Sequence, residues 1–518
     1  MERLSAKQKI GQRFAAGFPS TVISDDFIRL VKEYKIGNVI LFKENIQSKE
    51  QLYSLCRALQ TLIMAETGYP AFIAIDQEGG VVSRLSDDAA VIPSAMAIAA
   101  TGNVQNAYEA GLLTGRELNA LGVNFNLAPD MDVNSNPCNP VIGVRSYGDT
   151  PETVCAYGTH MIRGLTDAGI LCTAKHFPGH GDTAVDSHLG LPCVEKSLGE
   201  LQACELKPFA AAIRAGVSAV MTSHILFPIL EPDKLPATMS RRIITGLLKN
   251  EMGFTGLVLS DCMMMSAIRE HYGTVQGCLM AAKAGVDLIF ISHSCELAGE
   301  AAHAMLKACE NGGLDAGEMD VSVEKILRLK QNILSRPVEP LEVVGCDAHR
   351  EAVSRMMTKA VTEVHVPPAG RPKLGPSPLF LGCYPFRPTI ASNPEDRGIS
   401  FPKFMAERLG GDFLITSTDP NEAEIDAAVA LSAGHSCLVA GTYNGHLKPG
   451  QTALVRALAA TGIPTVCVAL RNPYDLSYIP SNVYTLAAYA YDELSLNAVL
   501  KVLAMKAEAP GKLPVTLP

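Results

Sequence analysis

Ionisable side chains are concentrated in one short stretch of the chain, residues 175–188, with the sequence KHFPGHGDTAVDSH. It holds three histidines, two aspartates and a lysine, and it directly follows the apolar run ILCTA at 170–174. A short apolar run of this kind predicts a buried strand. A lysine and a histidine at the end of such a strand indicate contact with a polar molecule outside the sheet.

Four other apolar runs also end in polar or ionisable residues. These residues are Asp76 in IDQEGG, Asp130 and Asp132 after NLAP, Ser223 and His224 in AVMTSH, and Asp261 in GLVLSD. A single aspartate at such a place can equally cap a helix. Five strand ends with the same character predict one shared site at the edge where the strands end together.

The elements that must position these residues follow a regular alternation. Eight strand-like apolar runs begin at positions 14, 38, 71, 123, 170, 219, 256 and 287. Stretches of helical period separate them, most clearly at 50–66, 106–122 and 152–169. Alternation predicts a parallel sheet, and eight repeats predict a closed (β/α)8 barrel with its active site at the carboxyl ends of the strands.

A second domain is expected after the helix-like stretch 318–334. Two prolines and a loss of periodicity in RPVEPLEVVGCDAHR indicate a linker. We predict an α/β protein with a barrel domain over 1–335, a linker over 336–350 and a smaller open α/β sandwich over 351–518. This second domain should start with a helix at 349–364, followed by strands at 378–385, 412–417, 436–444 and 463–470. It has no GxGxxG loop or P-loop, so no nucleotide site is predicted there.

Composition limits the classes of partner. The net charge is −9 with few basic runs, which argues against nucleic acid or an anionic membrane as partner. Apolar runs stay below the ~20 residues of a membrane helix, and the start of the chain lacks the ~7 to 15 apolar residues of a secretory signal. The 14 cysteines contain no CxxC pair, which is typical of free thiols in a reducing compartment. We therefore expect a cytoplasmic protein with a small polar substrate, of undetermined oligomeric state.

Several long motifs, taken in order, resemble the family 3 glycoside hydrolases, in particular their β-N-acetylglucosaminidase branch. The motifs are IDQEGG at 75–80, NLAPDMDVNSNPCNPVIGVRSYG at 126–148, KHFPGHGDTAVDSH at 175–188 and LVLSDCMMM at 257–265. The α/β second half and its ending PGKLPVTLP are similar to that family's second domain. One departure is Val81, which stands where the family usually has arginine after QEGG.

The resemblance implies catalytic and substrate-binding roles for eight residues. It implies that Asp261 is the nucleophile and that His188, paired with Asp186, is the general acid/base. Five further residues are implied as sugar contacts: Asp76, Arg84, Arg145, Lys175 and His176. The implied fold is the two-domain form, and neither a cofactor nor a metal is implied.

The chemistry of glycoside cleavage agrees with these roles. A covalent intermediate requires a carboxylate beneath the anomeric carbon and a proton donor at the leaving oxygen. Histidine, with an ordinary pKa of ~6.5, can donate that proton and then act as a base. Asp186 and His188 are separated by one residue, so in an extended loop their side chains can lie on the same side. We expect Gly179 and Gly181 to let this loop close over the sugar, with His180 structural.

Structural and metal-binding alternatives remain for individual residues. A metal site could use His176, His180, Asp182 and His188, although Pro178 and Gly179 preclude the helical face on which an HxxxH pair usually binds a metal. A capping box from Thr183 to Asp186 would explain that aspartate but not His188. Glu78 could cap a helix, and Arg145 could form a surface ion pair.

The sequence thus predicts a retaining exo-β-N-acetylglucosaminidase that needs no cofactor. The resemblance implies a small carbohydrate substrate with terminal N-acetylglucosamine, such as a cell-wall fragment or muropeptide. The alternatives are a phosphorylase that uses phosphate as acceptor, a related β-glucosidase, and a non-enzymatic sugar sensor. The sensor would lack either the nucleophile or the acid, and the sequence has both.

Overall fold

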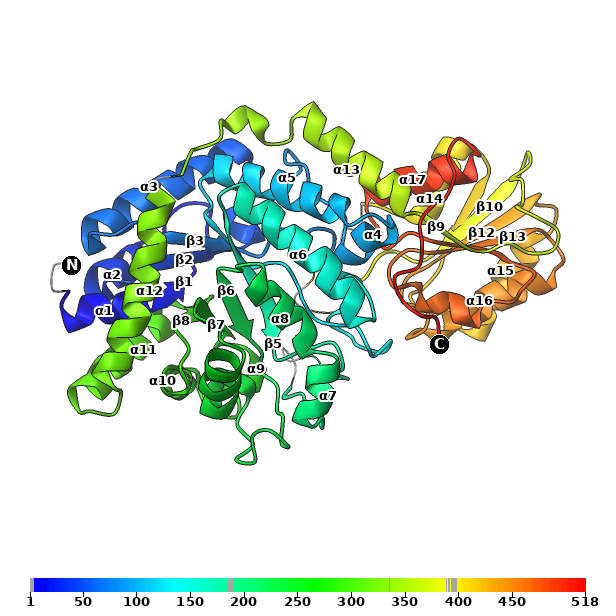
Figure 1. The fold of residues 1–518 in the computed structure, drawn as a ribbon. Helices are drawn as coiled ribbons and strands as arrows, with labels where there is room; N and C mark the ends of the chain where they lie inside the picture. Colours follow the sequence, from blue (N-terminus) through cyan, green and yellow to red (C-terminus); the bar gives the residue numbers. More distant parts are fainter. Residues whose placement is uncertain are drawn as a thin grey trace.

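The predicted barrel is confirmed in a computed structural model, which describes residues 4–184, 186, 190–334, 336–387, 389, 392 and 398–518. Within this part of the chain, eight parallel strands close into a barrel in sequence order, with helices around them (Figure 1). The strands are β1 (Phe14–Ala16), β2 (Asn38–Leu41), β3 (Phe72–Ile75), β4 (Phe125–Asn126), β5 (Leu171–Phe177), β6 (Ala219–Thr222), β7 (Leu257–Cys262) and β8 (Leu288–Ile291). Each strand starts within its predicted run.

Helices of the barrel half follow the predicted period, and several begin at a hydroxyl cap. Ser24, Ser48, Thr150 and Ser294 each accept a hydrogen bond from a backbone N–H of the first turn. The helices are α1 (Ala6–Gln12), α2 (Asp25–Tyr34), α3 (Lys49–Thr67), α4 (Ala95–Ala100), α5 (Gln105–Leu121), α6 (Pro151–Asp167), α7 (Leu198–Ala203), α8 (Leu206–Arg214), the π-helix η4 (Arg242–Glu251), α9 (Ser266–Arg269), α10 (Thr274–Ala284), α11 (Cys295–Glu310) and α12 (Ala316–Leu334). Short 3-10 turns are η1 (Lys43–Asn45), η2 (Gly143–Arg145) and η3 (Ala237–Met239).

Apolar side chains fill the interior of the barrel. Phe72 and Phe125 meet edge to face there, with ring centroids 5.3 Å apart. Because the barrel strands are buried on both faces, their sequences are continuous apolar runs rather than alternating ones. The filled interior leaves the carboxyl ends of the strands as the place where polar side chains can gather.

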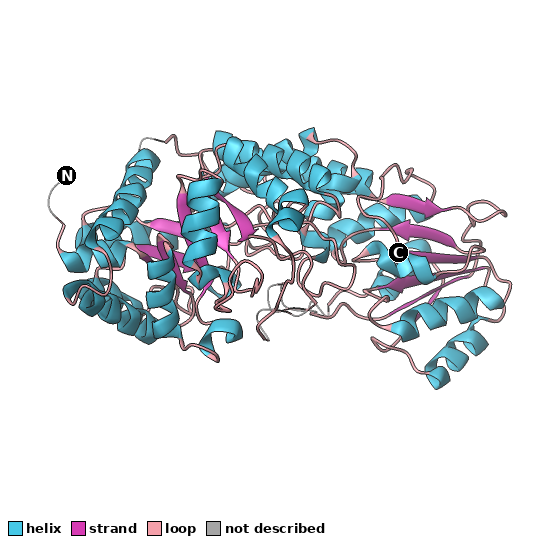
Figure 2. Cartoon of the chain, turned by 60° about the horizontal axis from the view of Figure 1, so that its bottom comes forward, coloured by secondary structure: helices cyan, strands magenta, loops and turns pink. Residues whose placement is uncertain are grey.

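The second half of the chain forms a mixed sheet with helices beside it (Figure 2). The strand order in its described part is β11-β10-β12-β13-β14-β9. Among these described strands, only β9 runs antiparallel to its neighbour. The strands are β9 (Thr362–His365), β10 (Pro378–Gly382), β11 (Asp412–Ile415), β12 (Cys437–Thr442), β13 (Thr465–Ala469) and β14 (Tyr484–Ala487). Helices are α13 (Asp347–Ala360), α14 (Phe401–Leu409), α15 (Glu422–Ser432), α16 (Pro449–Ala460) and α17 (Glu493–Leu503), with 3-10 turns η5 (Leu341–Val343) and η6 (Pro473–Tyr478).

The predicted helix over 349–364 is wrong at its carboxyl end. The helix ends at Ala360, and the following residues form β9 along β14. This segment contains Val361, Thr362 and Val364, whose β-branched side chains are suited to a pleated strand. Sequence analysis also missed β14, which has only four residues. The domain limits at 335 and 351 stay predictions.

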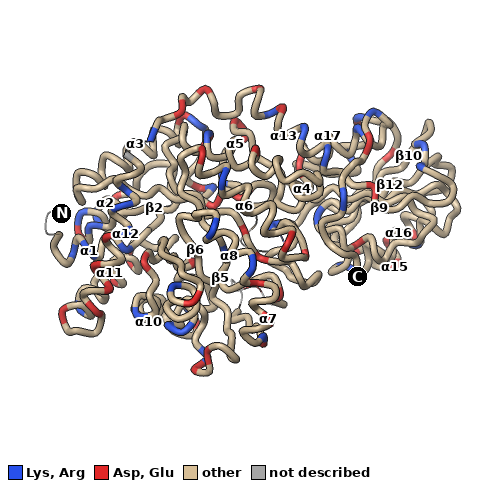
Figure 3. Tube along the Cα trace, in the orientation of Figure 1, with Lys and Arg blue, Asp and Glu red and all other residues tan. Residues whose placement is uncertain are grey.

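The two halves share apolar contacts. Met96 and Ala97 in α4 and Val144 in η2 belong to the same buried cluster as the core of the second sheet. Near the end of the chain, the backbone N–H of Lys512 donates to the carbonyl of Ala100 at 2.8 Å. Acidic and basic residues are interspersed along both halves (Figure 3). Among the described helices, none has the length and apolar character needed to cross a membrane.

A buried aspartate, Asp287, fixes the amino-terminal side of the barrel. Its carboxylate accepts hydrogen bonds from the Val258 N–H at 2.9 Å and the Ser322 hydroxyl at 2.7 Å, and lies 3.3 Å from the Lys249 ammonium. Burial alone would raise the pKa of Asp287, but Lys249 and Lys325 hold it below its ordinary value. The carboxylate therefore stays charged and connects β7, β8, η4 and α12.

We predict that Asp287→Ala lowers the free energy of unfolding by about 3–5 kcal/mol, because it leaves buried donors and two ammonium groups without their partner. Urea unfolding followed by circular dichroism measures the change. Asp320→Ala is the matched control, since Asp320 pairs with Lys9 on the surface with 56% of its side chain exposed, and should cost less than about 1 kcal/mol. Equal effects of the two substitutions would contradict this role for Asp287.

Candidate active site

A cavity of about 670 Å³ opens at the carboxyl ends of the barrel strands. Six of the predicted site residues line it together: Asp76, Arg84, Arg145, Lys175, His176 and Asp261. The predicted acid/base residue, His188, lies outside the described residues. Its predicted partner Asp186 is described and buried, and its contacts are given below. Of the residues picked out at strand ends, Asp76, Lys175, His176 and Asp261 therefore meet at one site, whereas Asp130, Asp132, Ser223 and His224 are not among the residues that line this cavity.

Asp261 is the carboxylate of β7 that faces this cavity. It follows the buried residues Leu257 to Ser260, and its own side chain is half-buried. Its Oδ1 accepts a hydrogen bond from the N–H of Cys262 at 2.6 Å. A side chain on a paired strand has little backbone freedom, so this carboxylate is held in a fixed position at the cavity wall.

Glu78 is a buried carboxylate between two cations. Its oxygens accept a bidentate pair of hydrogen bonds from Arg145, both at 2.8 Å, and lie 2.7 Å from the Lys175 ammonium. The ammonium of Lys175 also donates to Asp76 at 2.7 Å. Arg145 is 5% exposed, so neither a helix cap at Glu78 nor a surface ion pair at Arg145 describes these residues. Glu78 was not predicted as a site residue, although it lies two residues after Asp76 in the same motif.

The charges of this network reinforce one another. Burial would raise the pKa of Glu78, but Arg145 and Lys175 outweigh it and hold that pKa well below its ordinary value. Burial would likewise lower the pKa of Lys175, but Asp76 and Glu78 raise it above its ordinary value. Glu78 and Lys175 are therefore both charged near neutral pH, and the Lys175 ammonium lies 2.7 Å from Asp76 at the cavity wall.

Arg84 is positioned by the loop that follows β3. The Gln77 side-chain oxygen accepts hydrogen bonds from the backbone N–H of Arg84 at 2.9 Å and of Leu85 at 3.3 Å. Gly79, with a φ of 97°, makes the turn of this loop, and a Cβ there would lie 2.6 Å from Ile92. Burial lowers the pKa of the Arg84 guanidinium, and Asp76 opposes that shift. The loop thus carries Asp76, Glu78 and Arg84 on one tight turn.

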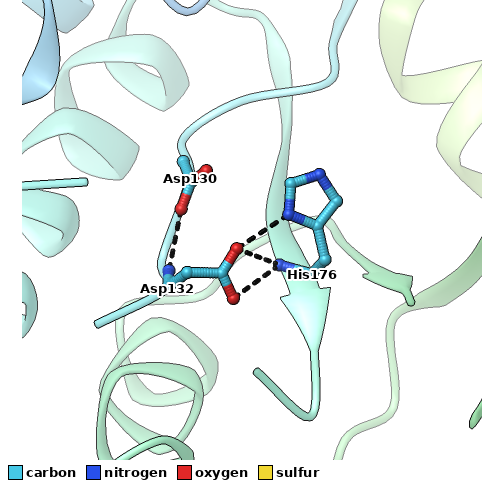
Figure 4. A group of neighbouring side chains, drawn as sticks. All are labelled: Asp130, Asp132 and His176. Carbon is cyan, nitrogen blue, oxygen red and sulfur yellow. Dashed lines mark hydrogen bonds and ion pairs between the residues drawn. The ribbon is translucent and has the colours of Figure 1, made fainter. Parts of the chain in front are cut away.

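His176 is oriented by Asp132 (Figure 4). The Asp132 carboxylate is 2.8 Å from His176 Nδ1 and accepts the backbone N–H groups of His176 and His180. The Nε2 of His176 lies on the side of Arg145, whose Nη2 is 3.5 Å away.

Asp130 and Asp132 share this buried region but differ in charge. The N–H of Asp132 donates to Asp130 Oδ1 at 2.8 Å (Figure 4). Burial raises the pKa of Asp132, but His176 and His180 more than offset this and lower it; burial and the nearby Asp132 raise the pKa of Asp130 well above its ordinary value. The pKa values of the two carboxylates are thus shifted in opposite directions.

The described residues of the possible metal site, His176, His180 and Asp182, each contact a different partner. His176 faces Asp132, His180 Nδ1 is 2.8 Å from the Thr183 hydroxyl, and Asp182 is 2.7 Å from the Lys196 ammonium. A different set, Asp130, Asp132 and His176, does have donor atoms within 4.8 Å of one another. Asp132 and His176 are already hydrogen-bonded to each other, with Asp132 orienting the imidazole. We therefore do not propose a metal at these three residues.

The loop after β5 is held by close packing. A Cβ on Gly181 would lie 1.6 Å from the carbonyl oxygen of Val133, so this position needs glycine for close approach rather than for loop freedom. Gly179 has a φ of 146°. Burial, together with His176, lowers the pKa of His180 to about 4, so His180 is neutral near pH 7 and supports the loop.

The second half of the chain contributes to this site. The hydroxyl of Thr389 donates to Asp186 Oδ2 at 2.7 Å, and both residues are 4% exposed. Arg387 and Ser392, also from the second half, line the cavity. These three residues were not predicted, because nothing in the local sequence indicates that they reach the barrel.

We predict that Glu78→Gln destabilises the protein at pH 7 by about 3–5 kcal/mol, because Arg145 and Lys175 lose their shared carboxylate. The pKa of Glu78 is lower in the folded than in the unfolded state, where it is ~4.3. Its stabilisation is therefore complete above ~4.3 and is lost as pH falls toward the folded value.

The difference in unfolding midpoint between wild type and Glu78→Gln should accordingly shrink from pH 5 to pH 3. Thermal unfolding across this range measures it. Glu310→Gln, at the exposed end of α11, is the control and should change stability by less than about 0.5 kcal/mol at every pH. A constant difference between wild type and Glu78→Gln would contradict the depressed pKa.

The chain was compared with known proteins. The sequence profile described as the glycosyl hydrolase family 3 N terminal domain matches residues 6–329. Beta-hexosaminidase A of Pseudoalteromonas piscicida is 31% identical over 552 residues, covering 96% of this chain and 92% of that protein. A glycoside hydrolase family 3 beta-N-acetylglucosaminidase from Paenibacillus sp. str. FPU-7 has a solved structure with 38% identity and a TM-score of 0.91, covering 99% of both chains.

A more distant structure has the same fold. Beta-glucoside phosphorylase BglX is 21% identical with a TM-score of 0.83, covering 99% of this chain and 94% of that one. The profile match over the barrel, together with a relative 31% identical over nearly the whole length, shows that the chain belongs to glycosyl hydrolase family 3.

Proposed function

We propose that the protein is a retaining exo-β-N-acetylglucosaminidase that releases terminal N-acetylglucosamine through a covalent glycosyl-enzyme. The observation that carries this proposal is that Asp261 faces the same cavity as the Lys175–Asp76 pair and Arg84. A fixed carboxylate beside a set of hydrogen-bonding groups suits attack on a bound sugar. The names of the beta-hexosaminidase and beta-N-acetylglucosaminidase relatives support this sugar specificity.

Asp261 is the proposed nucleophile. Its carboxylate oxygen bonds to the anomeric carbon while the bond from that carbon to the leaving oxygen breaks. The leaving oxygen takes a proton from His188. In the second step His188 takes a proton from water, and the water oxygen displaces Asp261 from the anomeric carbon. Two inversions at this carbon give overall retention.

His188 is the proposed acid/base on the basis of its motif, and Asp186 is proposed to orient it. The Thr389 hydroxyl holds Asp186 Oδ2 at 2.7 Å, so one carboxylate oxygen is fixed by the second half of the chain. A carboxylate paired with an imidazole keeps it in one tautomer and stabilises its cation. Asp186 therefore tunes the proton transfer and does not carry it out.

The sugar contacts are proposed from the cavity wall. Asp76 accepts hydrogen bonds from sugar hydroxyls, and Lys175, Arg84 and Arg145 donate to them. His176, whose Nδ1 is bound to Asp132, offers its Nε2 to the sugar side. We further propose that the substrates are cytoplasmic glycosides from cell-wall fragments, including muropeptides, and that water is the acceptor. The resemblance of the motifs to the family supports these proposals.

We predict that Asp261→Asn lowers kcat on 4-nitrophenyl N-acetyl-β-glucosaminide by at least about three powers of ten, because it removes the nucleophile. Circular dichroism should show a folded protein. An activated 2-deoxy-2-fluoro glycoside followed by peptide mass spectrometry should place the label on Asp261. A label on another carboxylate would overturn the assignment.

A second prediction concerns proton transfer. His188→Gly should slow glycosides with poor leaving groups far more than activated nitrophenyl glycosides, since the latter need little protonation to depart. Asp186→Ala should give a milder form of the same dependence, because it only orients and tunes the imidazole. The slope of log kcat/KM against leaving-group pKa measures both. A uniform loss across leaving groups would exclude His188 as the acid.

A further inference from the structure

His224 lies two residues beyond the end of β6 and contacts the backbone next to Asp261. Its side chain is 1% exposed, and it is not among the described residues that line the cavity. Its Nε2 is 3.1 Å from the carbonyl oxygen of Cys262, the residue that follows Asp261. A carbonyl oxygen only accepts hydrogen bonds, so this contact requires a hydrogen on Nε2. A buried histidine thus reaches the strand that carries the proposed nucleophile.

The end of β7 that carries Asp261 is irregular. Its pairing with β6 ends at Leu259. On the side of β8, Leu259 pairs with Leu288 and Cys262 pairs with Phe290, so β7 has one residue more than β8 between these pairs. An extra residue of this kind forms a β-bulge, which interrupts the ladder and changes the direction of a side chain. The backbone around Asp261 therefore needs contacts beyond the ladder to keep its direction.

The peptide that joins Cys262 to Met263 is held from both sides. Its carbonyl faces His224 Nε2, and its N–H, that of Met263, donates to the carbonyl of Phe290 in β8 at 2.9 Å. One peptide earlier, the N–H of Cys262 donates to Asp261 Oδ1 at 2.6 Å. A rotation of either peptide would move the donor that orients this carboxylate. The hydrogen bond from His224 thus restricts the direction of Asp261.

Thr238 of η3 holds the imidazole of His224. The Thr238 hydroxyl lies 2.9 Å from His224 Nδ1 and 2.9 Å from the Thr222 hydroxyl, and it donates to the carbonyl of Ser223 at 2.9 Å. Thr222 and Thr238 are both fully buried. A satisfied network of buried polar groups is rigid. The ring is therefore anchored at Nδ1, with Nε2 directed at the carbonyl of Cys262.

We propose that His224, held by Thr238, is a positioning residue that aims the Asp261 carboxylate at the anomeric carbon. This inference rests on the proposed function, which assigns the attack on the sugar to Asp261. The proposed sugar contacts Asp76 and Lys175 lie on the turn after β3 and on β5. Loss of the hydrogen bond from His224 should therefore slow formation of the covalent bond and leave sugar binding unchanged.

Inactivation by an activated 2-deoxy-2-fluoro glycoside separates these two effects, because it gives both a binding constant and a rate constant for covalent bond formation. His224→Phe keeps a ring but removes both nitrogens. It should lower the rate constant about 10- to 100-fold and change the binding constant by less than about twofold, since a small misplacement of a reacting group costs rate. His224→Gln can place an N–H near the position of Nε2 and should recover most of the rate.

Thr238→Val keeps the side-chain shape but removes the hydroxyl, and should lower the rate constant about 3- to 10-fold, the worth of one hydrogen bond. Thr67→Val is the matched control. Thr67 lies in α3, is 2% exposed and donates its hydroxyl to the carbonyl of Ile63 at 2.8 Å. Its substitution should lower the unfolding temperature and keep the wild-type rate constant.

A wild-type rate constant in His224→Phe overturns the proposal, and so does a loss that lies entirely in the binding constant. A His224→Gln variant as slow as His224→Phe overturns it as well, because the hydrogen bond to Cys262 would not be the cause. If His224→Phe does not fold, a wild-type rate constant in Thr238→Val has the same consequence. A label on a carboxylate other than Asp261 in wild type would instead reject the proposed function.

Discussion

The site depends on one buried carboxylate, Glu78, placed between Arg145 and Lys175. Three segments of the barrel meet at this group: the turn after β3, the loop after β4 and the end of β5. A buried carboxylate is tolerable only with counter-charges nearby, and a buried lysine or arginine has the same requirement. Each group therefore stabilises the charged form of the others, and together they hold Lys175 against Asp76, where a sugar hydroxyl can be bound.

A second constraint is the contact between the two halves of the chain. Apolar residues of α4 and η2 join the core of the second sheet, and Arg387, Thr389 and Ser392 lie at the barrel rim. From there Thr389 holds Asp186, and Arg387 and Ser392 complete the cavity wall. The second half thus supports the proposed acid/base pair, although the proposed proton donor is carried by the barrel.

The sequence was sufficient to predict the barrel because its strands are buried on both faces and so appear as continuous apolar runs. The convergence of strand ends in a barrel predicted the shared site of Asp76, Lys175, His176 and Asp261. Arg84 and Arg145 were implied by the family resemblance of the motifs. Glu78 was missed although it lies two residues after Asp76, because its partners Arg145 and Lys175 lie 67 and 97 positions further along the chain. The role of Gly181 was misread for a similar reason, because only the fold brings Val133 against it. Contacts of this kind depend on tertiary packing and leave no local pattern.

The proposed covalent bond between Asp261 and the sugar requires retention at the anomeric carbon. Proton NMR of the first N-acetylglucosamine released, recorded before mutarotation, measures the stereochemistry directly. We expect the β-anomer to appear first and the α-anomer to grow only at the rate of mutarotation. Early appearance of the α-anomer would show direct displacement by water and would contradict the role of Asp261 as nucleophile.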